Sequence, residues 1–208
     1  MTSSVQDNEQ FIREACDGQR WEGAAVATLD AYGSEIVGFL TFKLKSVPEA
    51  HEVFSMFSED LWMGLPQFSW RCSMRTWVYT LARNAASRYR SAAYRRRERG
   101  GDELTDASGV EHAIARVRSA THEYQKTDIK DRFRSLRDEL DEEDQMLLVL
   151  RVDRNLSWRD LALAMTGDIA LEEEAINKEA ARLRKAFERV KSELRRLAQR
   201  EGLLNVTE

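Results

Sequence analysis

The chain has 208 residues, a length that fits one large domain or two small ones. It contains only 2 Pro and 10 Gly, and its abundance of Ala, Leu, Glu and Arg favours helices over a sandwich, a barrel or a collagen-like fibre. Its 42% hydrophobic residues exclude a disordered polymer, and a formal net charge of −4 by itself suggests no nucleic-acid partner.

The net charge conceals blocks of opposite sign along the chain. Residues 1–70 carry a net charge of −7 and residues 100–176 carry −9. Between them, residues 71–99 hold 9 Arg against one Glu, and residues 177–208 hold 9 basic residues against 5 acidic ones. The two basic stretches could each meet a polyanion, whereas the alternative interpretation is that they are solvated faces.

Several classes of function are excluded by what the sequence lacks. Cys16 and Cys72 have no metal-ligand spacing and the three His are scattered, so we expect no metal site, no disulfide and a reducing, cytoplasmic compartment. No apolar run approaches the length of a membrane span, and no secretory signal is present. Without a glycine-rich phosphate loop or a nucleophile beside a base, the sequence predicts neither an enzyme nor a cofactor.

The N-terminal half predicts three long helical segments. Apolar residues at helical spacing indicate a helix over residues 21–45. Ser46 begins a capping box with Pro48 in the first turn, which predicts a helix that runs to Trp62. The sequence Gly64-Leu65-Pro66 ends it, and a short loop over 67–73 leads into a helix over residues 74–97.

The C-terminal half begins after a polar, glycine-containing stretch. Gly100-Gly101 and Ser108-Gly109 mark a domain boundary, with a weaker helix over 110–124. Asp141 and Ser157 stand at capping positions before two short helices, and a regular apolar stripe predicts a last helix near 172–200. We therefore predict an all-α chain of two small helical domains joined by a flexible linker: 1–98, linker 99–127, 128–201 and tail 202–208.

The last three helices match a helix-turn-helix in their order. In the third, four basic residues fall opposite the apolar stripe and Asn177 lies near its start, a pattern that suits reading of base edges in a major groove; the four are Lys178, Arg182, Lys185 and Arg189. A solvated face or a helix that binds a protein partner is the alternative. Three consecutive acids at 172–174 count against deep entry into a groove.

The helix over 74–97 combines aromatic residues and arginines. Met74 and Trp77 share its predicted inner face with Val78, Leu81 and Ala85, while the opposite face carries Thr76, Tyr79, Arg83 and Arg90. Trp70 and Arg71 precede it. Flat side chains that stack unpaired bases, next to cations that hold phosphates, are typical of single-stranded nucleic-acid binding. The alternative is a plain core role, which is favoured for Phe68 and Trp77 and stays open for Trp70 and Tyr79.

Several ordered strings resemble regions of bacterial sigma factors. The strings at 49–54, 61–62 and 65–68, followed by Ser-Met-Arg-Thr-Trp-Val-Tyr-Thr-Leu-Ala-Arg-Asn at 73–84, resemble region 2 of the extracytoplasmic-function class of the sigma-70 family. The strings at 147–151, 156–162 and 175–178 resemble region 4. The resemblance spans residues 22–98 and 128–198, and the string at 73–84 is its specific part.

The resemblance implies a non-enzymatic polymerase subunit that directs initiation at particular promoters. It implies binding to core RNA polymerase through the β′ clamp helices and the β flap, and it leads us to expect an anti-sigma partner. The implied core-polymerase contacts are Glu49, Glu52, Val53, Met56 and Glu59. The implied contacts to the −10 element are Trp70, Arg71, Arg75, Tyr79, Asn84 and Arg88. The implied contacts to the −35 element are Asn177, Lys178, Arg182 and Lys185, with Ser157 and Arg159 at phosphates.

The chain also departs from the family pattern. Ser55 and Met56 replace a usual Gln-Glu pair, His51 replaces an acid, and the turn at 166–171 is longer than usual. These departures leave a second interpretation open, a degenerate sigma-like adaptor that binds polymerase or a regulator without recognising promoters. A conventional repressor would not need the N-terminal half.

Overall fold

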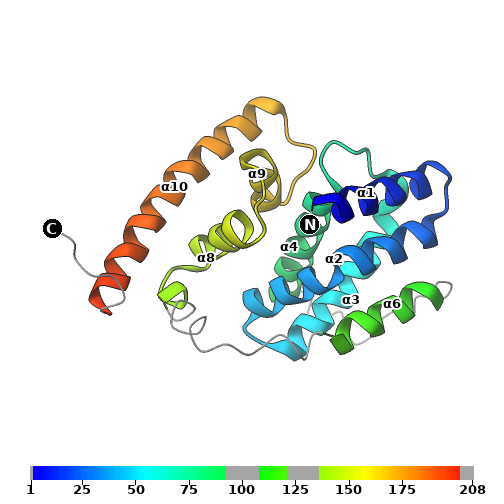
Figure 1. The fold of residues 1–208 in the computed structure, drawn as a ribbon, viewed down its shortest axis with the longest axis horizontal. Coiled ribbons are helices and arrows are strands. Elements are labelled where there is room, and N and C mark those ends of the chain that lie inside the picture. The colour runs from blue at the N-terminus through cyan, green and yellow to red at the C-terminus, as the bar shows by residue number, and fades with distance from the viewer. Residues whose placement is uncertain (1, 92–107, 121–135, 202–208) are drawn as a thin grey trace. The chain divides into compact units, whose positions relative to one another are not determined.

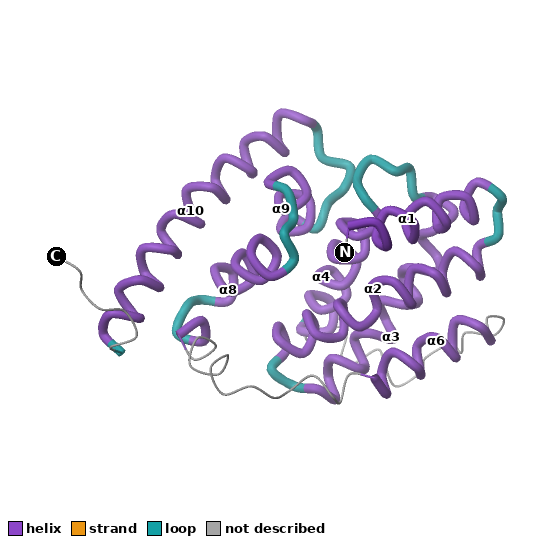
Figure 2. The backbone as a smooth tube through the Cα atoms, viewed as in Figure 1, coloured by secondary structure: helices purple, strands orange, loops and turns teal. Residues whose placement is uncertain are grey.

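The computed structural model describes residues 2–91, 108–120 and 136–201, and the regular elements in these ranges are all helices (Figure 1, Figure 2). The prediction of an all-α chain is confirmed for this part of the chain. By their contacts the residues divide into unit 1, Met1–Tyr124 with Thr166–Ile169, and unit 2, Gln125–Met165 with Ala170–Glu208. The predicted helix end at 92–97, the boundary at 99–107, the second domain's start at 128–135 and the tail at 202–208 lie outside the described residues.

Unit 1 is built around one central helix, α2. Its described elements are α1 (Thr2–Asp17), α2 (Trp21–Leu44), α3 (Val47–Gly64), the single turn η1 (Leu65–Gln67), α4 (Met74–Arg90) and α6 (Ser108–Ala120). α2 packs against α1, α3, α4 and α6. A helix with neighbours on most sides needs apolar residues around most of its circumference, and α2 buries residues from Ala24 to Leu44 accordingly.

Three helices begin at the side-chain caps that the sequence predicts. The Ser46 hydroxyl accepts a hydrogen bond from the Glu49 amide at 3.4 Å, at the start of α3. In unit 2, Asp141 accepts from the Asp144 amide at 2.8 Å, and Ser157 accepts from an amide one turn ahead at 3.1 Å. Each side-chain oxygen satisfies an amide that has no partner within the helix, which fixes where the helix begins.

The helix α1 was not predicted. It buries Ile12, Ala15 and Cys16, which are three and four residues apart, and it packs on α2. Its one apolar stripe is short, and most of its other residues are polar. This weak pattern is the reason that the sequence did not reveal it.

The predicted linker at 99–127 needs a correction, because α6 lies within it and packs on α2 as part of unit 1. The two helices approach closely at Gly33, where a Cβ atom would lie 2.8 Å from a methyl carbon of Val117. The amide of Gly109 also donates to the Glu22 carboxylate at 3.2 Å. The structured first domain therefore extends at least to the end of α6.

Unit 2 is helical where the structure describes it, and its main described elements are α8 (Glu142–Leu148), the π-helical turn η4 (Val149–Asp153), α9 (Trp158–Thr166) and α10 (Glu173–Arg200). The predicted stripe on α10 is confirmed, with Ile176, Leu183, Val190 and Leu197 all buried. Ion pairs hold both ends of α10: Arg159 contacts Glu173 at 2.8 Å and Arg200 contacts Glu139 at 2.7 Å.

Within the described residues, no helix has both the length and the apolar character that crossing a membrane requires.

Candidate nucleic-acid interface

The loop before α4 holds a ladder of aromatic rings. Phe68 stacks on Trp77 with ring centroids 4.3 Å apart, and Trp70 follows at 4.9 Å from Phe68. Phe68 and Trp77 are buried, so the core interpretation is correct for both. Trp70 is only half-buried, and Arg71 beside it is exposed. The loop therefore presents one aromatic and one cationic side chain at the surface of unit 1.

Tyr79 and Arg75 lie elsewhere than predicted. The Tyr79 ring is 1% exposed and meets Phe39 edge to face at 5.3 Å, so the predicted stacking of Tyr79 on a base is wrong for this structure. Its hydroxyl donates to Glu35 at 3.2 Å, and Arg75 binds the same carboxylate at 2.8 Å. The prediction assumed one buried face, but α4 packs against both α2 and α3, so the side that carries Tyr79 and Thr76 is also inside.

The last two candidates for the −10 element lie further along α4. Asn84 is half-buried. Arg88 is exposed and forms an ion pair with Asp60 of α3. Of the six candidates, Arg71 and Arg88 are exposed, Trp70, Arg75 and Asn84 are half-buried, and Tyr79 is buried.

The candidate polymerase-binding helix α3 divides into two faces. Glu52 and Glu59 are exposed and Glu49 is half-buried. Partial burial, reinforced by neighbouring Asp60, raises the pKa of Glu59. Val53 and Met56 are 0% and 5% exposed, so the predicted surface contacts through these two residues are wrong: both belong to the core.

One side chain of α6 contacts α3 at two of the positions that depart from the family pattern. Arg118 donates to the backbone oxygen of His51 at 2.9 Å and to the hydroxyl of Ser55. Desolvation lowers the pKa of Arg118 from its ordinary value. A short serine hydroxyl at position 55 is thus in direct contact with α6.

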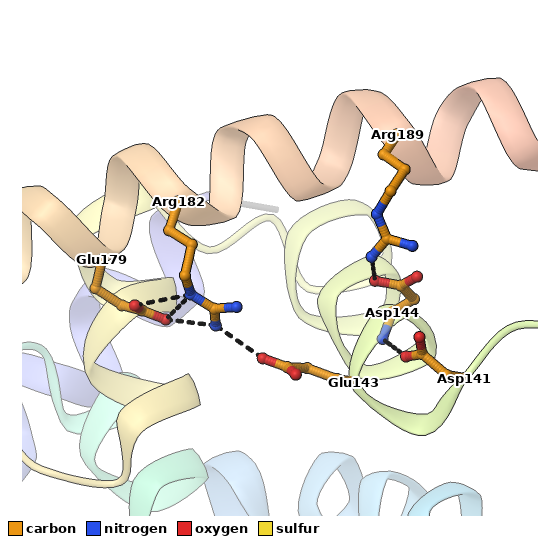
Figure 3. A network of polar contacts seen from close by, with 6 residues as sticks. All are labelled: Asp141, Glu143, Asp144, Glu179, Arg182 and Arg189. Carbon is orange, nitrogen blue, oxygen red and sulfur yellow. Dashed lines mark hydrogen bonds and ion pairs between the residues drawn. The ribbon is translucent and has the colours of Figure 1, made fainter.

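Two of the four basic residues predicted on the exposed face of α10 are bound to acids of the same unit (Figure 3). Arg182 contacts both carboxylate oxygens of Glu179 and also Glu143 of α8 at 2.7 Å. Arg189 contacts Asp144 at 2.6 Å. Hydrogen bonds to the two glutamates raise the pKa of Arg182, so its charge is firmly held.

Asp144 is a buried carboxyl group with competing neighbours. Its side chain is 7% exposed, and Asp141 caps its amide. Burial raises the pKa of Asp144 and Asp141 adds to the rise, while the ion pair with Arg189 opposes both. The cost of burial exceeds the gain from this one ion pair.

The other candidates for the −35 element differ in how firmly they are held. Asn177, Lys178 and Lys185 are exposed, and the two lysines have no ion-pair partner within the described residues. Ser157 caps α9 and its hydroxyl lies 2.6 Å from the Asp160 carboxylate. Arg159 is engaged by Glu173.

Four acidic residues that organise these surfaces were not among the predicted site residues. Glu35 and Asp60 hold arginines of α4, Glu143 holds Arg182, and Glu9 caps the start of α4. The two members of each pair are 28 to 65 residues apart in sequence, so no local sequence pattern could have indicated the contact. Only the spacing of Ile12, Ala15 and Cys16 could have indicated α1, and with it Glu9.

Comparisons with family models, with curated proteins and with solved structures find no match to this chain.

Proposed function

We propose that the chain is a sigma factor of the extracytoplasmic-function class, a dissociable subunit that directs cytoplasmic RNA polymerase to particular promoters. One observation carries the proposal. The string at 73–84 begins at Ser73, whose hydroxyl caps α4, and it directly follows a loop that places Trp70 and Arg71 at the surface. A half-buried aromatic side chain next to an exposed cation suits binding of an unpaired strand.

Unit 2 supplies the contact to duplex DNA in this proposal. The helices α9 and α10 are proposed to act as a helix-turn-helix, with Asn177, Lys178 and Lys185 exposed in the N-terminal half of α10. The two lysines are available to phosphates or to base edges because no acid among the described residues holds them. Arg182 contributes only after it exchanges Glu143 and Glu179 for DNA.

The polymerase contact falls to three acids of α3, of which two are exposed and one is half-buried. Glu49, Glu52 and Glu59 are proposed to meet the β′ clamp helices, while Val53 and Met56 hold the helix on the core from below. The expected anti-sigma partner would compete for the same surfaces. No catalytic or cofactor-binding group has a part in this proposal.

Reconstituted transcription tests the proposal. The wild-type chain should co-elute with core polymerase and support initiation at a restricted set of promoters from the host genome. The variant Lys178→Ala with Lys185→Ala should co-elute normally and lose most initiation that depends on a −35 element. Lys191→Ala is the matched control on the same helix, since Lys191 is already paired with Glu188 at 2.8 Å. Failure of the wild-type chain both to co-elute and to initiate would overturn the proposal.

The contact of Arg118 with His51 and Ser55 favours a second candidate, a sigma-like adaptor that binds a regulator or polymerase without recognising promoters. The helix α6 bonds to α3 at His51 and Ser55, where the family pattern is broken, and so occupies part of the α3 surface. An adaptor would co-elute with its partner and fail to initiate at every promoter, and Lys178→Ala with Lys185→Ala would leave its binding unchanged.

A further inference from the structure

The helix α1 contacts the loop before α4 through two side chains one helical turn apart. Glu9 accepts a hydrogen bond from the Met74 amide at 2.8 Å. Arg13 lies four residues later on the same face of α1, and its Cζ atom is 5.1 Å from the centroid of the Trp70 ring. The bond from Glu9 fixes α1 against the start of α4 and so keeps Arg13 over this ring.

Trp70 is held in an unusual backbone conformation. Its φ of +57° lies in the left-handed region, which bulky residues other than glycine seldom adopt. Such a conformation persists only where the surroundings impose it, and it is concentrated at functional sites. Here the surroundings are Phe68 at 4.9 Å and the guanidinium of Arg13. The loop thus presents the indole ring in a defined place.

The contact of Arg13 with the Trp70 ring is weak enough for a ligand to displace it. The side chain is exposed, and it has no carboxylate partner within the described residues. Its contact with the Trp70 ring at an exposed site is worth only about two- to fivefold in an equilibrium constant. Stacking of an unpaired base on an aromatic side chain is worth about 5- to 150-fold. A base can therefore displace the guanidinium from the ring.

We propose that Arg13 and Trp70 form a binding site for one unpaired nucleotide of single-stranded DNA. The base takes the place of the guanidinium on the indole ring, and the guanidinium moves to the neighbouring phosphate. The single strand would be promoter DNA, so this identification of the ligand rests on the proposed function. The site adds α1 to the −10 interface, which the resemblance confined to the loop and α4.

Fluorescence anisotropy with a labelled oligothymidylate and the full-length chain tests the site. We expect Arg13→Ala to weaken binding by about three- to tenfold. The slope of log K against log salt should become shallower by about 0.7, the value for one phosphate contact on a single strand. Arg13→Lys should keep the slope, because a lysine can still bind the phosphate.

A double-mutant cycle distinguishes a shared site from two independent effects. Trp70→Ala should weaken binding, and Arg13→Ala should add less in that background than in the wild type. Arg20→Ala is the matched control, an exposed arginine just beyond α1 that does not contact Trp70. Thermal unfolding should be the same for Arg13→Ala and wild type, and Arg13→Gln provides a second variant.

The site would be overturned if Arg13→Ala bound oligothymidylate with the same affinity and salt slope as the wild type. It would also be overturned if the wild-type chain did not bind the oligonucleotide at low salt. The proposed function is judged separately by initiation assays. Initiation that is independent of Arg13 would overturn this site and leave the sigma-factor proposal standing. If the chain bound single strands through Arg13 but never initiated transcription, the site would stand and the sigma-factor proposal would be overturned.

Discussion

Tyr32 and Tyr79 are two buried tyrosines of unit 1 whose hydroxyl groups differ in their hydrogen bonding. The Tyr79 hydroxyl donates to Glu35, whereas the Tyr32 hydroxyl has no partner within the described residues. Burial raises the pKa of Tyr32 to about 12, so the hydroxyl stays neutral. An unpaired buried hydroxyl costs stability, and a paired one contributes to it.

We therefore predict that Tyr79→Phe lowers the free energy of unfolding by about 1–2 kcal/mol, and that Tyr32→Phe leaves it unchanged or raises it by about 1 kcal/mol. Urea unfolding of the two variants measures the difference. Equal losses in both would contradict the assignment. Tyr79→Phe should also leave binding to single strands unchanged, since the ring is inside the core.

Asp144 makes stability depend on pH in a direction opposite to that of most paired carboxylates. Because its pKa is raised, the folded chain keeps a proton that the unfolded chain has lost, in the interval above the ordinary value of 3.8. The free energy of unfolding contributed by this group thus falls as pH rises through that interval. The charged groups around it are Asp141, Glu143 and Arg189.

We predict that wild type loses stability relative to Asp144→Asn as the pH rises from 3.8, the ordinary pKa of the group, toward neutrality. Urea unfolding of both proteins across this range checks the prediction. The difference between their free energies of unfolding removes the contribution of the other carboxylates. A relative gain by wild type at higher pH would mean that the ion pair with Arg189 outweighs burial.

At the residue scale, sequence reasoning predicted the exposure of individual side chains only in part. It assigned Phe68 and Trp77 to the core correctly and placed Tyr79, Val53 and Met56 on surfaces they do not reach. The helical wheel locates a residue around a helix, but it does not say how many neighbours the helix has. Burial therefore required the tertiary structure.

Elements were more predictable than individual side chains. Capping serines, Asp141 and the glycine-proline break gave the limits of several helices, because these signals act through neighbouring backbone groups. The helix α1 and the docking of α6 were missed, since both depend on contacts between distant segments. The close approach at Gly33 is one such contact.

Two glycines of α2 provide a test of how α6 docks. A Cβ atom at Gly33 would lie 2.8 Å from the Val117 side chain, whereas at Gly23 it would meet nothing within 4 Å. We predict that Gly33→Ala lowers the free energy of unfolding by about 1–3 kcal/mol through overpacking. Gly23→Ala should instead raise it by about 0.5–1 kcal/mol, because alanine favours the helix. Urea unfolding with hydrogen exchange over α6 measures both.

The acidic first turn of α8 is predicted to oppose duplex DNA binding by α10. Removing the charge of Glu143 leaves Arg182 with Glu179 alone, so Glu143→Gln should raise affinity for duplex DNA by about two- to fivefold. Glu174→Gln makes the same change in net charge without touching Arg182, and it should have a smaller effect. Equal gains in affinity for both variants would mean that the change in net charge, and not the release of Arg182, is the cause. Anisotropy with a labelled duplex gives the comparison.

For the whole molecule, the net charge of −4 describes no surface that a partner would meet. The basic groups proposed to bind DNA lie in two units, with acidic residues before and between them. Single-strand and duplex contacts are thereby separated in the chain. Their joint use in the proposed function depends on a tether, which raises the effective concentration of the second contact once the first has formed.

This separation predicts a double dissociation. Arg13→Ala should weaken binding to oligothymidylate and spare a duplex, while Lys178→Ala with Lys185→Ala should spare the oligonucleotide. On the duplex, the two lysine substitutions should make the salt slope shallower by about 1.8, or 0.9 for each phosphate contact. A probe with single-stranded and duplex parts should show additive losses, as expected for sites that act independently. Cross-effects on the simple probes would contradict the separation.

The helix α10 provides a fixed distance within unit 2. It is continuous over 28 residues, and ion pairs from Arg159 and Arg200 hold its two ends. Spectroscopic labels at Glu174 and Arg195 would be about 32 Å apart along the helix axis, at 1.5 Å per residue. That separation should stay constant when DNA or a protein partner binds. Any change in the distance from either label to one in unit 1 would then report motion of unit 2 as a rigid body.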